Sequence, residues 1–191
     1  MNQTIKYILF AASVSLWSTL CFVLPDFIDN PHEGIAGWLA ICAYVGALGI
    51  VQFLLAYAIN TYRLIAAIIY PIYAVIGAGL AYYRVVFHTT LTPMILEATL
   101  HTNTEEALGV ISWTLIGWIL ANIIIASLFV AYRWRKIELT HPWAHCMIAI
   151  ACLLLYTHCN SRLRISIRQR YPMNVVNVVK DYTQSRRHQG E

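Results

Sequence analysis

The fold is decided by residues 35–59, IAGWLAICAYVGALGIVQFLLAYAI, a run without a single charged side chain. A helix that crosses the hydrocarbon core of a bilayer needs about 20 apolar residues, so this run is long enough to span one. It ends at the polar segment 60–63, and a second apolar run, residues 64–87, begins directly after it. Because the connection is so short, we expect two antiparallel transmembrane helices.

The rest of the chain continues the same pattern. Of the 191 residues, 59% are hydrophobic and 12% are charged, against about 45–50% and about 25% in an ordinary soluble domain. The mean hydropathy of +0.60 requires long apolar blocks. The sequence therefore predicts an all-α, polytopic membrane helix bundle of about five transmembrane helices. We expect these helices at about residues 5–24, 35–59, 64–87, 107–131 and 143–159, with a loop at residues 88–106 and a tail at residues 160–191.

The lysines and arginines of the short connections fall on one side of this topology. They are Lys6, Arg63, Arg133, Arg135 and Lys136, whereas residues 25–34 and 88–106 contain neither lysine nor arginine. Loops rich in lysine and arginine stay in the cytoplasm. We therefore expect a cytoplasmic amino terminus and, after five spans, a carboxyl terminus on the outer side.

The tail is basic as well, although this topology places it outside. Arginine is well suited to phosphate contacts, and the surface of a membrane is rich in phosphate. We expect residues 160–191 to form an interfacial segment that binds the membrane surface. Nucleic acid is not an expected partner, because a tail on the outer side meets none.

The outer loop at residues 88–106 carries the most informative sequence. Thr92 followed by Pro93 is typical of an N-cap and the first residue of a helix, which predicts a short interfacial helix over residues 93–100. Thr102 and Glu105 have the spacing of a capping box at the start of the next helix. That role leaves the carboxylate of Glu106 free to meet the ammonium of a lipid headgroup.

Residues 94–107, MILEATLHTNTEEA, resemble the periplasmic segment of bacterial phosphoethanolamine transferases. Members of that family modify lipid A, the lipopolysaccharide core or periplasmic glucans. The resemblance lies in a short helix followed by Thr-Asn, two further residues and Glu-Ala. In the family, five membrane helices precede a periplasmic catalytic domain of the alkaline phosphatase and sulfatase type.

The resemblance implies that Thr102, Asn103 and Glu106 bind phosphatidylethanolamine, the donor lipid. An asparagine that some members place a turn before the threonine is replaced here by Ala98. The resemblance also implies a bacterial inner membrane and a periplasmic outer side.

The family's nucleophilic threonine and zinc site are expected in a catalytic domain beyond Glu191. Within residues 1–191 we therefore expect no cofactor and no activity on their own. The alternative interpretation is a small non-enzymatic membrane protein that acts as a scaffold or binds lipid. A cluster of acidic residues and histidine in the first outer loop also suggests a cation, although the neighbouring prolines are typical of an ordinary turn-rich loop. These residues are Asp26, Asp29, His32 and Glu33.

Overall fold

The structure is a computed structural model, and its elements are all helical in the residues that it describes. Those residues are 2–27, 29, 33–103, 105, 108–109 and 111–189. Five of the described helices are long and apolar enough to cross a membrane. The predicted all-α membrane bundle is confirmed.

The first span, Gln3–Phe27, is built from three consecutive helical segments. They are α1 (Gln3–Ser18), a π-helical turn η1 (Thr19–Val23) and a 3-10 turn η2 (Leu24–Phe27). The other four spans are α2 (Gly34–Ile59), α3 (Arg63–Phe87), α6 (Trp113–Lys136) and α7 (Pro142–Cys159). The shorter helices are α4 (Pro93–His101), α8 (Ser161–Gln169) and α9 (Met173–Gln189).

The fourth span differs most from its predicted bounds of 107–131. It begins at Trp113 because Ser112 is its N-cap, with a side-chain oxygen that accepts a hydrogen bond of 3.1 Å from the amide of Leu115. It continues to Lys136, and basic side chains in a last helical turn are favoured by the helix dipole. Hydropathy placed this helix too early because the residues before the cap are also apolar.

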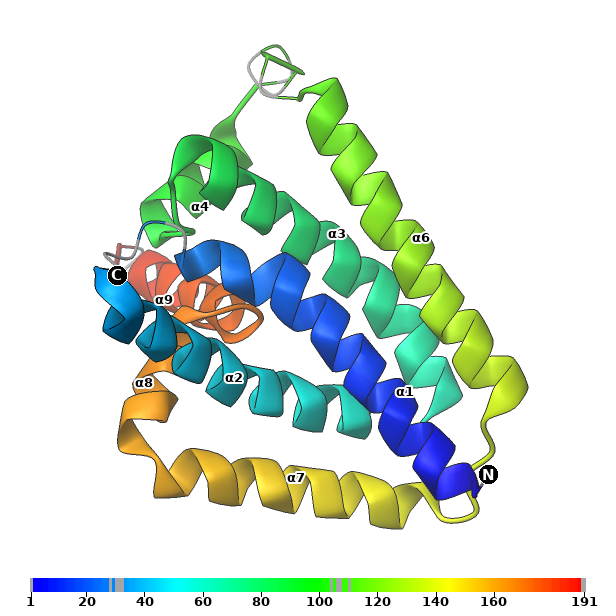
Figure 1. Ribbon diagram of the computed structural model, residues 1–191. Helices are drawn as coiled ribbons and strands as arrows, with labels where there is room; N and C mark the ends of the chain where they lie inside the picture. Colours follow the sequence, from blue (N-terminus) through cyan, green and yellow to red (C-terminus); the bar gives the residue numbers. More distant parts are fainter. Residues whose placement is uncertain are drawn as a thin grey trace.

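The spans converge at one end of the molecule and fan out toward the other (Figure 1). Among them, α3 packs along α6, while α2 packs along both α1 and α7. We call the end where α1 begins the basic end, and the end where α2 begins and α3 ends the loop end. The helices α4, α8 and α9 all lie at the loop end, where the fan is open (Figure 1).

Small residues allow the spans to approach closely. Ala66, Ala74 and Ala78 of α3 are fully buried in the core cluster that also contains aromatic side chains of the first span. Lipid tails are as apolar as the side chains, so helix association in a bilayer depends on such close packing and on interhelical hydrogen bonds. One of these bonds joins the indole nitrogen of Trp17, the donor, to the side-chain oxygen of Asn122 at 3.0 Å.

At the basic end, a buried arginine joins two connections. Arg133 is 2% exposed and donates to the carbonyl oxygens of Asn60 at 2.7 Å, Thr61 at 3.0 Å and Ile137 at 2.7 Å. The first two acceptors follow the C-terminus of α2, where the helix dipole favours a cation. The charge is thus held by carbonyl oxygens, and the turn between α2 and α3 is fixed to the end of α6.

Candidate functional site

The short helix α4 begins as the sequence predicts. Thr92 is its N-cap, with a hydroxyl oxygen that accepts from the amide of Ile95 at 3.2 Å, and Pro93 is its first residue. The helix ends at Thr102, whose hydroxyl donates backward to the carbonyl oxygen of Ala98 at 2.6 Å. Thr102 therefore stabilises the end of α4, a role that the capping-box prediction did not assign to it.

Two of the three predicted binding residues, Thr102, Asn103 and Glu106, are among the residues that the structure describes. Thr102 and Asn103 are described and exposed. Glu106 lies outside the described residues, so its role stays a prediction.

A cavity of about 920 Å³ lies at the loop end, between α3, α4 and α9. This volume is near the upper limit of the range of about 300–1,000 Å³ that is usual for small-molecule sites. Thr102 lines the cavity together with Thr99, one turn earlier on α4, whereas Asn103 does not line it. The structure thus places one of the predicted binding residues in the wall of a cavity.

The walls of the cavity separate apolar from polar side chains. Val75, Ile76 and Leu80 of α3 form an apolar wall within a membrane span. The hydroxyls of α4 and the amide side chains of Asn174 and Asn177 on α9 contribute polar groups. An amphiphile fits such an arrangement, with its chains along α3 and its headgroup among the polar side chains.

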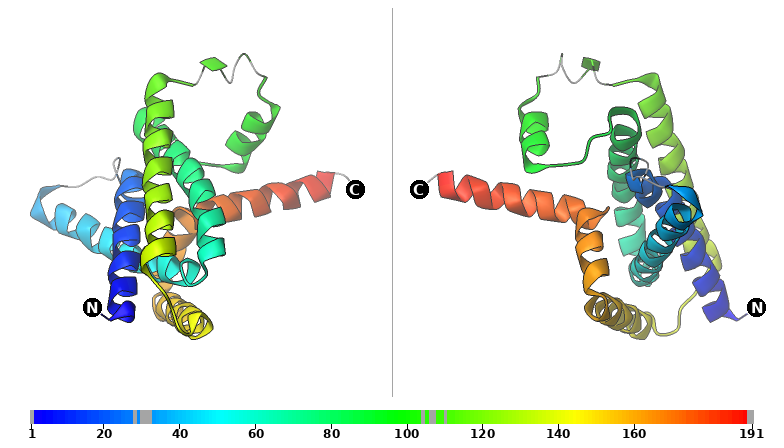
Figure 2. Two further views of the ribbon diagram at one scale, coloured as in Figure 1. Left: turned by 90° about the vertical axis from the view of Figure 1, so that its right-hand side faces the viewer. Right: turned by 60° about the vertical axis from the view of Figure 1, so that its left-hand side comes forward.

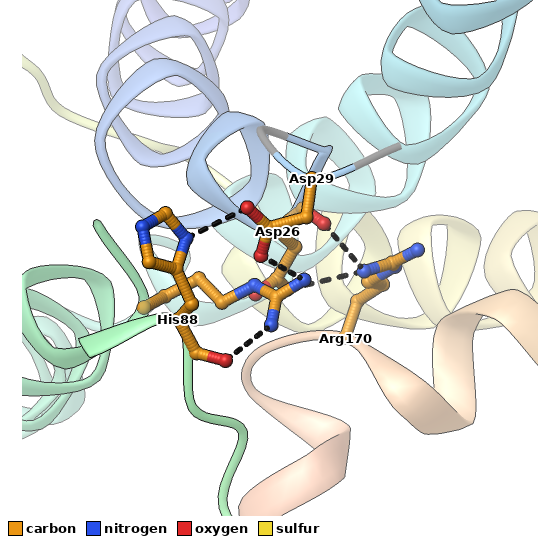
Figure 3. A network of polar contacts seen from close by, with 5 residues as sticks. Asp26, Asp29, His88 and Arg170 are labelled. Carbon is orange, nitrogen blue, oxygen red and sulfur yellow. Dashed lines mark hydrogen bonds and ion pairs between the residues drawn. The ribbon is translucent and has the colours of Figure 1, made fainter. Parts of the chain in front are cut away.

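Ion pairs join the segment at the end of the first span, which contains Asp26 and Asp29, to α3 and to the tail (Figure 3). The carboxylate of Asp29 lies 3.1 Å from Nη2 of Arg84 and 2.7 Å from Nδ1 of His88. The carboxylate of Asp26 lies 3.8 Å from Nη1 of Arg170. The two acidic residues thus face basic side chains from distant parts of the sequence.

These partners replace the cation that the sequence suggested as one possibility for the first outer loop. Within the described residues, no group of three histidine, cysteine or acidic side chains is placed to hold a metal ion; His32 is not among them. Sequence reasoning overlooked Arg84, although a signal was present. Arg84 is the one charged residue in the apolar run 64–87, and charged residues inside a span usually have a partner or a function.

The tail is held to the bundle by Tyr171, in the connection between α8 and α9. Its side chain is 6% exposed, and its hydroxyl donates to the carbonyl oxygen of Tyr73 at 2.7 Å. Its own carbonyl oxygen accepts from the side-chain amide of Gln52 at 2.9 Å. Burial raises the pKa of the Tyr171 phenol, so the hydroxyl stays protonated and remains a donor at neutral pH.

A glycine provides the space for this tyrosine. A Cβ atom built on Gly77 of α3 would lie 2.9 Å from ring atoms of both Tyr171 and Phe22. Real Cβ atoms do not approach other atoms so closely, and both rings are enclosed. Gly77 is therefore required for Tyr171 to insert between α3 and the end of the first span.

The burial of Tyr171 fixes the position at which the last helix, α9, leaves the bundle. From Tyr171 onward, α9 projects sideways out of the bundle, away from the spans and on the side where α4 lies (Figure 2). It contacts α4 and α8, and this position brings its residues to the cavity. The tail therefore forms one wall of the cavity, in addition to the interfacial role that the sequence predicted for it.

Together, the fold and the cavity define a multi-pass membrane protein with an amphiphile-sized site at one end of its helix bundle. Residues 47–169 match the family described as Phosphoethanolamine transferase EptA/EptB. The matched segment covers more than half of the chain, so the chain belongs to this family and contains its N-terminal membrane domain. Comparison with curated proteins and with solved structures gave no match.

Proposed function

We propose that this chain is the donor-binding membrane domain of a transferase that moves phosphoethanolamine from phosphatidylethanolamine to lipopolysaccharide or a related periplasmic acceptor. The observation that carries the proposal is the position of Thr102. The resemblance identified this residue without knowledge of the fold, and it lines a cavity with an apolar wall and polar side chains.

The hydroxyl groups of α4 favour a ligand that donates hydrogen bonds. Thr99 and Thr102 both line the cavity, and their hydroxyl protons are already donated, to the carbonyl oxygens of Ile95 at 2.7 Å and of Ala98 at 2.6 Å. A hydroxyl has one donor and two acceptor lone pairs. Both oxygens therefore offer acceptor capacity, which suits the primary ammonium of phosphatidylethanolamine. The quaternary ammonium of phosphatidylcholine cannot donate.

Glu106 is proposed as the charged partner of this ammonium, with Asn103 as a neighbouring contact. A carboxylate and an ammonium form a charge-assisted hydrogen bond, which is stronger than a bond between neutral groups. A site with hydroxyl acceptors and one carboxylate would select phosphatidylethanolamine both by charge and by its N–H groups.

The proposed location is a bacterial inner membrane, with the amino terminus in the cytoplasm and the cavity on the periplasmic side. The one-sided lysines and arginines of the connections support this orientation. The proposed periplasmic cavity would supply the donor lipid on the side where the acceptor is found.

Lipid preference tests this proposal. We expect the chain in nanodiscs to prefer phosphatidylethanolamine over phosphatidylcholine. Glu106→Gln should reduce this preference about tenfold, because it replaces a charge-assisted hydrogen bond with a neutral one, a difference of about 1.4 kcal/mol. Thr102→Ala is expected to have a smaller effect. Glu97→Gln is the matched control, because Glu97 is exposed on α4 and does not line the cavity.

Equal binding of the two lipids by the wild-type chain would refute the proposed donor. If Glu106→Gln leaves the preference unchanged, the carboxylate of Glu106 is not a ligand of the headgroup, although the cavity can still be the lipid site.

A further inference from the structure

We infer that Arg84 and Arg170 form a phosphate-binding subsite in the cavity, which takes the phosphodiester of a membrane lipid. The inference deepens the proposed function, because it assigns a second part of the same ligand. It stands on different residues from those that select the ammonium.

The two arginines come from distant parts of the chain and meet at one cavity. Arg84 lies near the end of α3 and Arg170 between α8 and α9, and both line the cavity. Their side chains are only 15% and 20% exposed. The guanidinium of Arg170 also lies over the ring of Phe27, with its central carbon 4.4 Å from the ring centroid. Both cations are therefore held in place before any ligand arrives.

The contacts of the two guanidinium groups use few of their donors. Each guanidinium carries five N–H groups. Arg84 donates to the carbonyl oxygen of His88 at 3.3 Å and contacts Asp29, and Arg170 donates to the carbonyl oxygen of Asp26 at 3.3 Å. In the part of the chain that the structure describes, both Nε atoms are buried without a hydrogen-bond partner. The protein contacts therefore do not saturate either guanidinium, and the exposed N–H groups of both side chains can donate to the oxygens of a phosphate.

The charge of the cavity also favours an anion. Among the described residues that line it, the charged side chains are Arg84, Arg168 and Arg170 against the single carboxylate of Asp26. That carboxylate is 3.8 Å from Nη1 of Arg170, beyond hydrogen-bond distance. Paired arginines are well suited to phosphate, since each guanidinium can bind two oxygens at once.

The apolar wall identifies the source of the phosphate. Val75 and Ile76 of α3 line the same cavity within a span, where acyl chains would lie. The ligand is therefore a phospholipid rather than a free phosphate ester.

The test measures binding of short-chain lipids to the full 191-residue chain in detergent. The probes are dihexanoyl phosphatidylethanolamine, phosphatidylcholine and phosphatidylglycerol, with dihexanoylglycerol as the phosphate-free probe. Arg84→Gln and Arg170→Gln are each expected to weaken binding of all three phospholipids about tenfold and to leave dihexanoylglycerol unchanged. Arg162→Gln, the same change at an exposed arginine of α8, should leave every probe unchanged.

Two further variants separate phosphate binding from loss of structure. Asp29→Asn removes the carboxylate that competes for Arg84 at 3.1 Å but keeps the arginine, and should not weaken phospholipid binding. Asp26→Asn removes the competing carboxylate and should tighten phospholipid binding several-fold. The inference is overturned if Asp26→Asn weakens binding as much as Arg170→Gln, or if both arginine variants bind phospholipids like the wild type.

The test of the phosphate subsite can succeed or fail independently of the proposed selection for the ammonium of phosphatidylethanolamine. A wild-type chain that binds all three phospholipids equally, with weaker binding in both arginine variants, would contradict the proposed donor and support the phosphate subsite. If both arginine variants retain the preference for phosphatidylethanolamine at full affinity, the result supports the proposed donor and contradicts the phosphate subsite. Glycerophosphoethanolamine, which lacks acyl chains, should compete weakly; competition as strong as that of the lipid would contradict a lipid ligand.

Discussion

Replacing Tyr171 with alanine should release the last helix from the bundle. The ring lies 4.8 Å from the ring of Tyr73 and 5.7 Å from that of Phe22, measured between centroids. Removing a buried aromatic ring costs about 3–5 kcal/mol, and the lost hydroxyl bond adds about 1 kcal/mol. The Gln52 bond to the backbone carbonyl is present in both proteins and does not alter this difference. Taking the lower limit for the ring alone, we expect the free energy of local opening of α9 to fall by at least about 3 kcal/mol.

Hydrogen exchange of the chain in nanodiscs measures this opening. A loss of about 3 kcal/mol corresponds to a rise of roughly a hundredfold in the exchange rates of α9 amides, while amides in the middle of α3 should change little. Tyr171→Phe keeps the ring and should raise the rates by about tenfold at most. Tyr44→Ala is the control, since Tyr44 is a tyrosine of α2 that is 46% exposed. The reasoning fails if Tyr171→Ala leaves α9 exchange unchanged, or if Tyr44→Ala raises it equally.

Three further predictions address other parts of the molecule. Arg133→Lys should lower the free energy of unfolding by about 2 kcal/mol, because one ammonium cannot reach three carbonyl oxygens. Thermal unfolding of this variant is compared with that of Arg135→Lys, and equal effects would contradict the role of Arg133 in joining the two connections. In a cysteine-free background, His101→Cys and Asp181→Cys should react with an impermeant thiol reagent from the periplasm and Arg135→Cys should not; the reverse pattern would invert the orientation. The purified chain should release no diacylglycerol from phosphatidylethanolamine, with or without zinc, and turnover would contradict a catalytic site outside residues 1–191.

The spans were predictable because the thickness of a bilayer fixes the length of an apolar run. The runs 35–59 and 64–87 predict α2 and α3 to within one residue at each end. The start of α6 was missed because hydropathy does not register a cap: Ser112 ends the loop, although apolar residues precede it. Where one hydrogen bond sets the boundary of a helix, composition predicts the position of that boundary only to within several residues.

The cavity was not predictable in the same way. Its walls come from α3, α4 and α9, and no local pattern shows that these segments meet. Thr102 was identified because its surroundings resemble a family motif, whereas Arg84 and Arg170 belong to no such motif. The burial of Tyr171 was not predicted for a physical reason as well, since a single tyrosine in a polar tail has no periodic apolar neighbours that would mark it as buried.

Photolabelling tests most directly whether the cavity holds phosphatidylethanolamine. A phosphatidylethanolamine with a diazirine in one acyl chain is incorporated at trace amounts into nanodiscs that contain the chain, and labelled residues are identified by mass spectrometry. We expect labelling at Ile76 and Leu80 in the cavity wall to be suppressed by added unlabelled phosphatidylethanolamine but not by the same amount of phosphatidylcholine. Leu154, an apolar residue of α7 that is 64% exposed, should lose label equally with either lipid. Equal suppression by both lipids at Ile76 and Leu80 would contradict a donor site in this cavity.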